Sequence, residues 1–140
     1  MFVPSNREIK HKNQLYILLK EILKDPLLSQ NLMFKGGTYA SLRGVLDRFS
    51  IDLDFDLPDR SKKEDIRKRC YEIFTKLELE IKDESKRHLQ FFLKYDALEG
   101  ERNTLKLEIN DDVSKYNGYE KVLLEQINMY CNGHTLDTMF

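Results

Sequence analysis

Apolar and acidic residues alternate without a break over residues 51–57, which read Ile-Asp-Leu-Asp-Phe-Asp-Leu. Because successive side chains of a strand point to opposite faces, this pattern predicts a strand with one apolar face and one acidic face. The acidic face carries Asp52, Asp54 and Asp56. Three carboxylates in a row repel one another, so a compensating positive charge is expected, and a divalent metal bound to a nucleotide is the natural candidate.

Other segments show the periodicity of helices and further strands. Apolar residues at helical spacing predict helices over residues 6–24 and 62–78, the first of which ends at Asp25-Pro26. Two segments joined by a glycine-containing turn predict an antiparallel hairpin of strands 88–96 and 104–110. Shorter patterns predict a strand over 31–35, a helix over 38–47, a strand over 122–131, a turn at 132–133 and the start of a helix at 135–140.

A glycine pair stands between the short strand and the short helix, in the sequence Gly36-Gly37-Thr38. Glycines let backbone amides approach a phosphate closely, and a helix that begins there favours an anion. The Thr38 hydroxyl could add a further hydrogen bond to a phosphate. The spacing of a Walker A loop or a Rossmann fingerprint is absent. We interpret this segment as a phosphate-binding turn, although a glycine pair alone is more often just a tight turn.

The spacing of the acids suits a metal site. Asp52 and Asp54 leave the same strand face with Cα atoms roughly 7 Å apart, which fits two carboxylates that converge on Mg²⁺ or Mn²⁺. Glu108, on the polar side of the strand at 104–110, would be the third carboxylate for in-line nucleotidyl transfer. Arg48 could contact a phosphate or form a salt bridge to one of these acids. A solvated sheet face remains the alternative interpretation of the acidic residues, Glu108 included.

The composition describes one folded domain: 140 residues, 41% hydrophobic, with a formal net charge of −1. This charge gives no sign of a nucleic-acid partner, and the basic run at 60–69 is interleaved with acids, which favours a solvated helix face over an RNA-binding one. No apolar run approaches the roughly 20 residues that span a bilayer, so no membrane association is expected. Cys70 and Cys131 lack metal-site spacing and are expected to be free thiols in the cytoplasm.

The glycine turn and the segment Arg48-Phe49-Ser50-Ile51-Asp52-Leu53-Asp54-Phe55 together resemble the AbiEii/AbiGii toxin family over residues 12–110. These are polymerase-β-like nucleotidyltransferases that form the toxin half of bacterial abortive-infection and toxin–antitoxin pairs. The resemblance implies an α+β (α/β) fold with a small mixed or antiparallel sheet and helices packed mainly on one side. It also implies that Asp52 and Asp54 bind metal, that residues 36–38 bind triphosphate and that Glu108 is the third acid.

The same resemblance implies transfer of NMP from an NTP to an RNA, tRNA or protein acceptor, with a cognate antitoxin as a partner. The family's later motifs, a helical lysine and an Arg-Asp pair in a C-terminal helical domain, have no match here. Residues 1–140 are therefore expected to be the nucleotidyltransferase core of a longer protein. Two other functions stay open: a small-molecule nucleotidyltransferase of the antibiotic-modifying kind, and a non-catalytic domain that binds a nucleotide or a partner.

Overall fold

The computed structural model describes residues 6–46, 52–96 and 103–139, and all statements below concern these residues. The helices are α1 (Asn6–Lys24), α2 (Pro26–Asn31), α3 (Gly36–Leu42) and α4 (Lys63–Lys76), with short 3-10 turns at Arg60–Lys62 and Glu125–Ile127. The strands are β1 (Met33–Lys35), β2 (Asp52–Asp56), β3 (Glu80–Ser85), β4 (Leu89–Lys94), β5 (Thr104–Asn110), β6 (Tyr119–Leu124) and β7 (Met129–His134).

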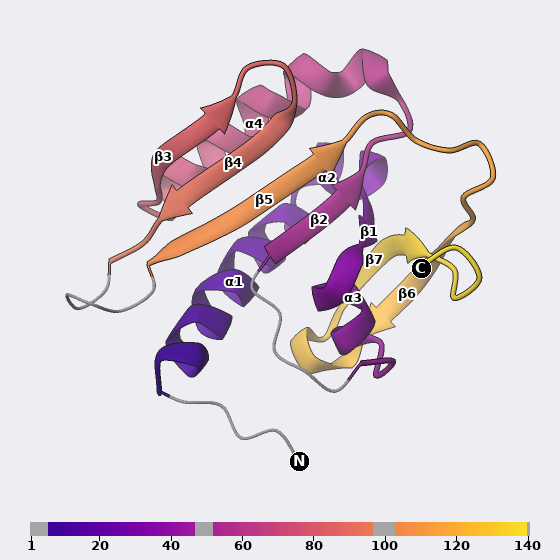
Figure 1. Cartoon of the computed structure of the whole chain (residues 1–140), viewed down its shortest axis with the longest axis horizontal. Helices are drawn as coiled ribbons and strands as arrows, with labels where there is room; N and C mark the ends of the chain where they lie inside the picture. Colours follow the sequence, from indigo (N-terminus) through magenta and orange to yellow (C-terminus); the bar gives the residue numbers. More distant parts are fainter. Residues whose placement is uncertain (1–5, 47–51, 97–102, 140) are drawn as a thin grey trace.

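The strands form one seven-stranded sheet in the order β3-β4-β5-β2-β1-β7-β6 (Figure 1). Strand β2 pairs in parallel with β5, and β1 pairs in parallel with β7, whereas the other neighbours are antiparallel. The acidic strand β2 therefore lies in the middle of the sheet, between the strand that carries Glu108 and the strand that leads into the glycine turn. The predicted hairpin of β4 and β5 is confirmed.

One face of the sheet is apolar and is covered by helices. In register, Phe55 lies opposite both Phe34 and Ile109, and Leu53 lies opposite Leu107, and all five side chains are at most 2% exposed. Figure 1 shows α1 behind β2 and β5, and α4 behind β3 and β4. The α+β class, the mixed sheet and the packing of helices mainly on one side agree with the expectation from the sequence. On β2 the opposite face carries Asp52, Asp54 and Asp56.

The C-terminal part of the sequence prediction was wrong. Instead of one strand over 122–131, β6 and β7 form a hairpin that reverses at Asn128, whose φ of 52° is left-handed. Gly133 lies inside β7 and not in a turn, and a Cβ atom there would lie 2.5 Å from the ring of Tyr39. This glycine serves close packing of α3 on the sheet. Residues 136–138 form a turn rather than the start of a helix.

Both cysteines are buried and unbonded to each other, and burial raises the pKa of each thiol to about 12. Such thiols are poor nucleophiles. Among the helices of the described residues, none has the length and apolar character to cross a lipid bilayer.

Candidate active site on the polar face of the sheet

The three predicted acids share one face of neighbouring strands. Asp52 and Asp54 alternate with the buried Leu53 and Phe55, so their side chains leave β2 on the polar face. The parallel pairing of β2 with β5 places Glu108 directly opposite Asp54. Residues in register on adjacent strands have Cβ atoms about 5 Å apart, so the three carboxylates form one acidic patch.

The glycine bend lies against this patch. Gly36 adopts a φ of +85°, which favours glycine, and a Cβ atom placed on it would lie 2.6 Å from Oδ2 of Asp54. The Thr38 hydroxyl donates a 2.5 Å hydrogen bond to the backbone carbonyl of Asp52, and its side chain is buried. Thr38 thus fastens the bend to β2, and its donor is not available for the phosphate contact suggested by the sequence. Backbone amides at the start of α3 remain for that contact.

Asp54 has a raised pKa. Burial, followed by repulsion from Asp52 and Glu108, raises its pKa to about 6 from the ordinary value of 3.8, while Lys106 and Lys35 oppose the rise. The charged carboxylate is therefore disfavoured in the folded protein. A divalent cation at this position would relieve both the repulsion and the desolvation.

We expect Asp54→Asn to stabilise the ligand-free protein by about 1–2 kcal/mol at pH 8, a figure discounted because the side chain is only partly buried. Because the folded-state pKa lies above the unfolded one, Asp54 destabilises the fold above about pH 6. This penalty falls as the pH drops and vanishes below about pH 4. Urea denaturation of wild type and Asp54→Asn at pH 8 and near pH 4 measures this difference in stability. The exposed Asp112→Asn serves as the control. A destabilised Asp54→Asn at pH 8 would contradict the account.

The acids do not yet form a complete set of metal ligands. Within the three described segments, no group of three His, Cys, Asp or Glu side chains is arranged to hold one ion. Asp52 and Asp54 lie on one face, whereas Glu108 pairs with Lys106 at 3.2 Å. Mg²⁺ is commonly held by one or two carboxylates together with substrate phosphates and water. The pair on β2 fits this mode, and Glu108 is a possible third ligand only after it leaves Lys106.

Asp56, on the same face, has a different environment and is only 1% exposed. Lys35 Nζ lies 2.8 Å from its Oδ1, and His134 Nε2 lies 2.6 Å from its Oδ2. Tyr119 and Asn117 contact the same Oδ2 at 3.0 and 3.4 Å. Burial alone would raise the pKa of Asp56, but Lys35 and His134 lower it overall. Asp56 is thus a buried anchor that ties β2 to β1, β6 and β7, a role that the sequence analysis missed.

Of the other residues that the sequence singled out, the structure describes the basic run but not Arg48. The basic run of α4 is largely engaged in ion pairs: Arg67 with Glu84 at 3.0 Å, and Arg69 with Asp25 at 2.8 Å. This pairing agrees with the structural interpretation of the run and disfavours an RNA-binding face.

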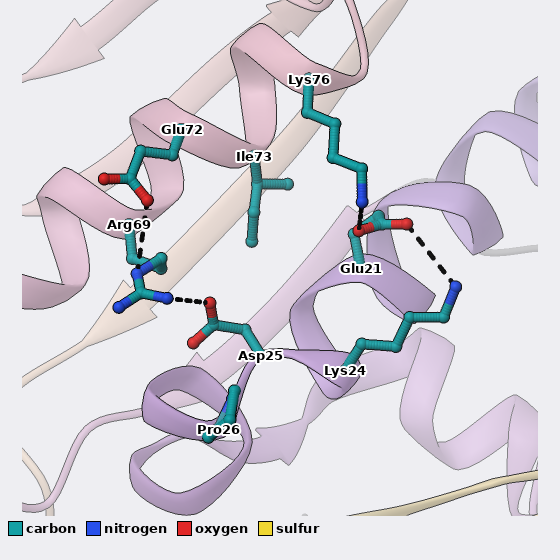
Figure 2. A pocket seen from close by; sticks show the side chains of 8 residues that line it. All are labelled: Glu21, Lys24, Asp25, Pro26, Arg69, Glu72, Ile73 and Lys76. Atoms are coloured by element: carbon teal, nitrogen blue, oxygen red, sulfur yellow. Dashed lines mark hydrogen bonds and ion pairs between the residues drawn. The ribbon is translucent and has the colours of Figure 1, made fainter.

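A pocket of about 330 Å³ lies between α1, α2 and α4, on the helical side of the molecule (Figure 2). Its charged side chains pair with one another, as Lys76 does with Glu21 and Arg69 does with Asp25, both at 2.8 Å. Since the acids of β2 point to the opposite face of the sheet, this pocket is not part of the candidate active site.

Comparison with known proteins finds a family model that matches the sequence and solved structures that share the fold. A profile described as "Nucleotidyl transferase AbiEii toxin, Type IV TA system" matches residues 17–127. An H. pylori protein described as a candidate nucleotidyltransferase shares the fold, with a TM-score of 0.62 at 21% identity over 97% of this chain. JHP933 from Helicobacter pylori does so with a TM-score of 0.64 at 19% identity over 98% of this chain. The chain spans 57% and 56% of these two proteins. No curated protein matches it.

Proposed function

Because the chain belongs to the AbiEii nucleotidyltransferase toxin family, we propose that its acidic patch and glycine bend bind an NTP and transfer NMP to an acceptor, with release of pyrophosphate. The observation that carries this proposal is the contact between Gly36 and Asp54. A Cβ atom on Gly36 would meet the Asp54 carboxylate at 2.6 Å, so the acid proposed to bind metal and the turn proposed to bind phosphate adjoin directly. An acidic strand of purely solvated character has no need of such a contact.

Each residue has a distinct role in this proposal. Asp52 and Asp54 hold Mg²⁺ or Mn²⁺, and Glu108 completes the site or accepts the proton of the acceptor hydroxyl. Amides of residues 36–38 bind the triphosphate, and Thr38 holds the bend against β2 through Asp52. Arg48 is kept as a candidate phosphate contact. The metal, when bound, would neutralise the charge that develops on the phosphoryl oxygens. With a pKa of about 6, the Asp54 carboxylate is still mostly ionised at neutral pH and is available to bind a metal.

For the acceptor and partners we propose RNA, tRNA or a protein as the acceptor, a cognate antitoxin as the regulator and the cytoplasm as the location. Membership of a family described as a type IV toxin supports the antitoxin. A small-molecule acceptor of the antibiotic kind uses the same acids, and an acceptor screen of tRNA against aminoglycosides separates the two. NTP binding without turnover by the full-length protein would instead favour a non-catalytic domain.

We expect the full-length protein to label RNA or protein from at least one of the four NTPs in the presence of Mg²⁺. The double variant Asp52→Ala/Asp54→Ala should reduce this labelling by a factor of at least about 10³, because it loses both carboxylates proposed to bind the metal. The exposed Asp112→Ala serves as a control that changes charge nearby without touching the acidic patch. Equal labelling by the double variant and by wild type would refute the proposed function.

A further inference from the structure

Lys106 stands inside the acidic patch. It lies on β5 between the buried Leu105 and Leu107, so its side chain shares the polar face with Glu108, and register pairs it with Asp52. Its Nζ atom lies 3.2 Å from Oε2 of Glu108. The bond to Glu108 raises the pKa of Lys106, burial opposes the rise, and attraction to the acids of β2 adds to it. The ammonium group is therefore paired with Glu108, and its residue lies in register with Asp52 of the proposed metal site.

Lys35 is another lysine on this face, and its environment differs from that of Lys106. Lys35 Nζ is bound 2.8 Å from Asp56, whose side chain is 2% exposed, so this lysine is part of the buried anchor. Lys106 instead pairs with Glu108, whose side chain is 43% exposed. Exposed ion pairs contribute little to stability and exchange partners readily. Lys106 can leave its partner, whereas Lys35 cannot do so without leaving a buried carboxylate uncompensated.

We propose that Lys106 is a positioning residue that occupies the acidic patch in the absence of a divalent cation and holds Glu108 away from Asp52 and Asp54. A cation that binds the two aspartates displaces the ammonium group and frees Glu108 to join them. This inference rests on the proposed function, because it assumes that the aspartates bind a metal. It accounts for the finding that, among the described residues, no three ligand side chains already face one ion.

The proposal makes Lys106 a competitor of the metal. Removing a positive charge from a residue in register with Asp52 should strengthen metal binding, since neighbouring like charges repel appreciably even in a partly solvated site. The expected effect on affinity is opposite to that of losing a metal ligand. It is also opposite to the effect expected if Lys106 only supported the fold of β5.

Titration with Mn²⁺ followed by electron paramagnetic resonance tests this on the full-length protein without nucleotide. We expect Lys106→Met to bind Mn²⁺ roughly three- to tenfold more tightly than wild type. Lys106→Arg keeps the charge and should bind nearly as wild type does. Lys94→Met removes a positive charge from the exposed end of β4 on the same face, and it should change the affinity less than twofold.

Circular dichroism of each variant confirms that it is folded before the titration. If wild type binds Mn²⁺ and Lys106→Met binds it equally or more weakly, the role of Lys106 is refuted while the proposed function stands. If Lys94→Met tightens binding as much as Lys106→Met does, the effect is one of overall charge and the inference is also refuted. If wild type binds no Mn²⁺, both the inference and the metal part of the proposed function fail.

Discussion

Gly36→Ala is expected to destabilise the protein by about 2–4 kcal/mol and to remove nucleotidyl transfer. Alanine at a φ of +85° costs about 1–2 kcal/mol in backbone strain alone. The new Cβ atom would also lie 2.6 Å from Oδ2 and 3.1 Å from Cβ of Asp54, so the carboxylate must move. Since Asp54 has a short side chain on a central strand, its displacement alters both the proposed metal-binding acid and the turn.

Gly44 provides a matched control for this prediction. Its φ of +76° is also left-handed, but a Cβ atom there would meet nothing within 4 Å. Gly44→Ala should therefore cost only the backbone strain of about 1–2 kcal/mol and keep activity. Urea denaturation and the labelling assay, applied to both variants, measure the difference. Equal losses of stability and activity in the two variants would show that the contact with Asp54 has no special importance.

Asp56→Ala is expected to cause the largest loss of stability, about 3–5 kcal/mol. The substitution removes the carboxylate but leaves the groups that face it: the ammonium of Lys35, and His134 and Tyr119 from the C-terminal hairpin. Leaving one charge of a buried network without its partner is more destabilising than losing an exposed ion pair. Strand β1 and the C-terminal hairpin of β6 and β7 would lose a shared attachment to β2.

The effect of replacing Asp56 should differ in sign from the effect of replacing Asp54. Two acids only two residues apart, on one face of one strand, should respond to neutralisation with opposite signs: Asp54→Asn stabilises the protein at pH 8, and Asp56→Ala destabilises it. Thermal and urea unfolding of the two variants at this pH provide the comparison. A cost below about 1 kcal/mol for Asp56→Ala would mean that the buried anchor is not what holds the C-terminal hairpin to the sheet.

The parts of the fold that the sequence predicted are those with strong local periodicity. Helix α1 was predicted with its observed bounds, and β5 was predicted over the residues that it occupies, because in both the buried positions recur with the period of the element. The acidic face of β2 followed from the same rule. A pattern of this kind reports which side of an element faces the core, so it also indicates which side chains share a site.

The missed elements have weak or conflicting local signals. Asp25-Pro26 was interpreted as the end of a helix, but Pro26 is also the first residue of α2, and Asp25 caps that helix by accepting from the Leu28 amide. Strand β3 is an edge strand that reads Glu-Ile-Lys-Asp-Glu-Ser, and most of it is exposed, so it shows no alternation. Its strand conformation comes from pairing with β4, which a local pattern cannot show.

The candidate site was also predictable only where the local sequence carries a signal. The acids of β2 and the glycine bend could be found because each has a local signature. The role of Asp56 could not, because its partners Asn117, Tyr119 and His134 lie 61–78 residues further along the chain. The ion pair of Lys106 with Glu108 was also overlooked, although two residues of opposite charge spaced by two on a predicted strand must lie side by side.

The acidic patch beside the glycine bend is proposed to transfer the nucleotidyl group of an NTP. Incubation of the full-length protein with Mg²⁺, acceptor RNA and protein, and NTP labelled on either the α- or the γ-phosphate tests this directly. We predict that the α-label is incorporated, that the γ-label is released as pyrophosphate, and that Asp54→Asn incorporates neither despite its greater stability. Incorporation of the γ-label, or undiminished incorporation of the α-label by Asp54→Asn, would contradict the account.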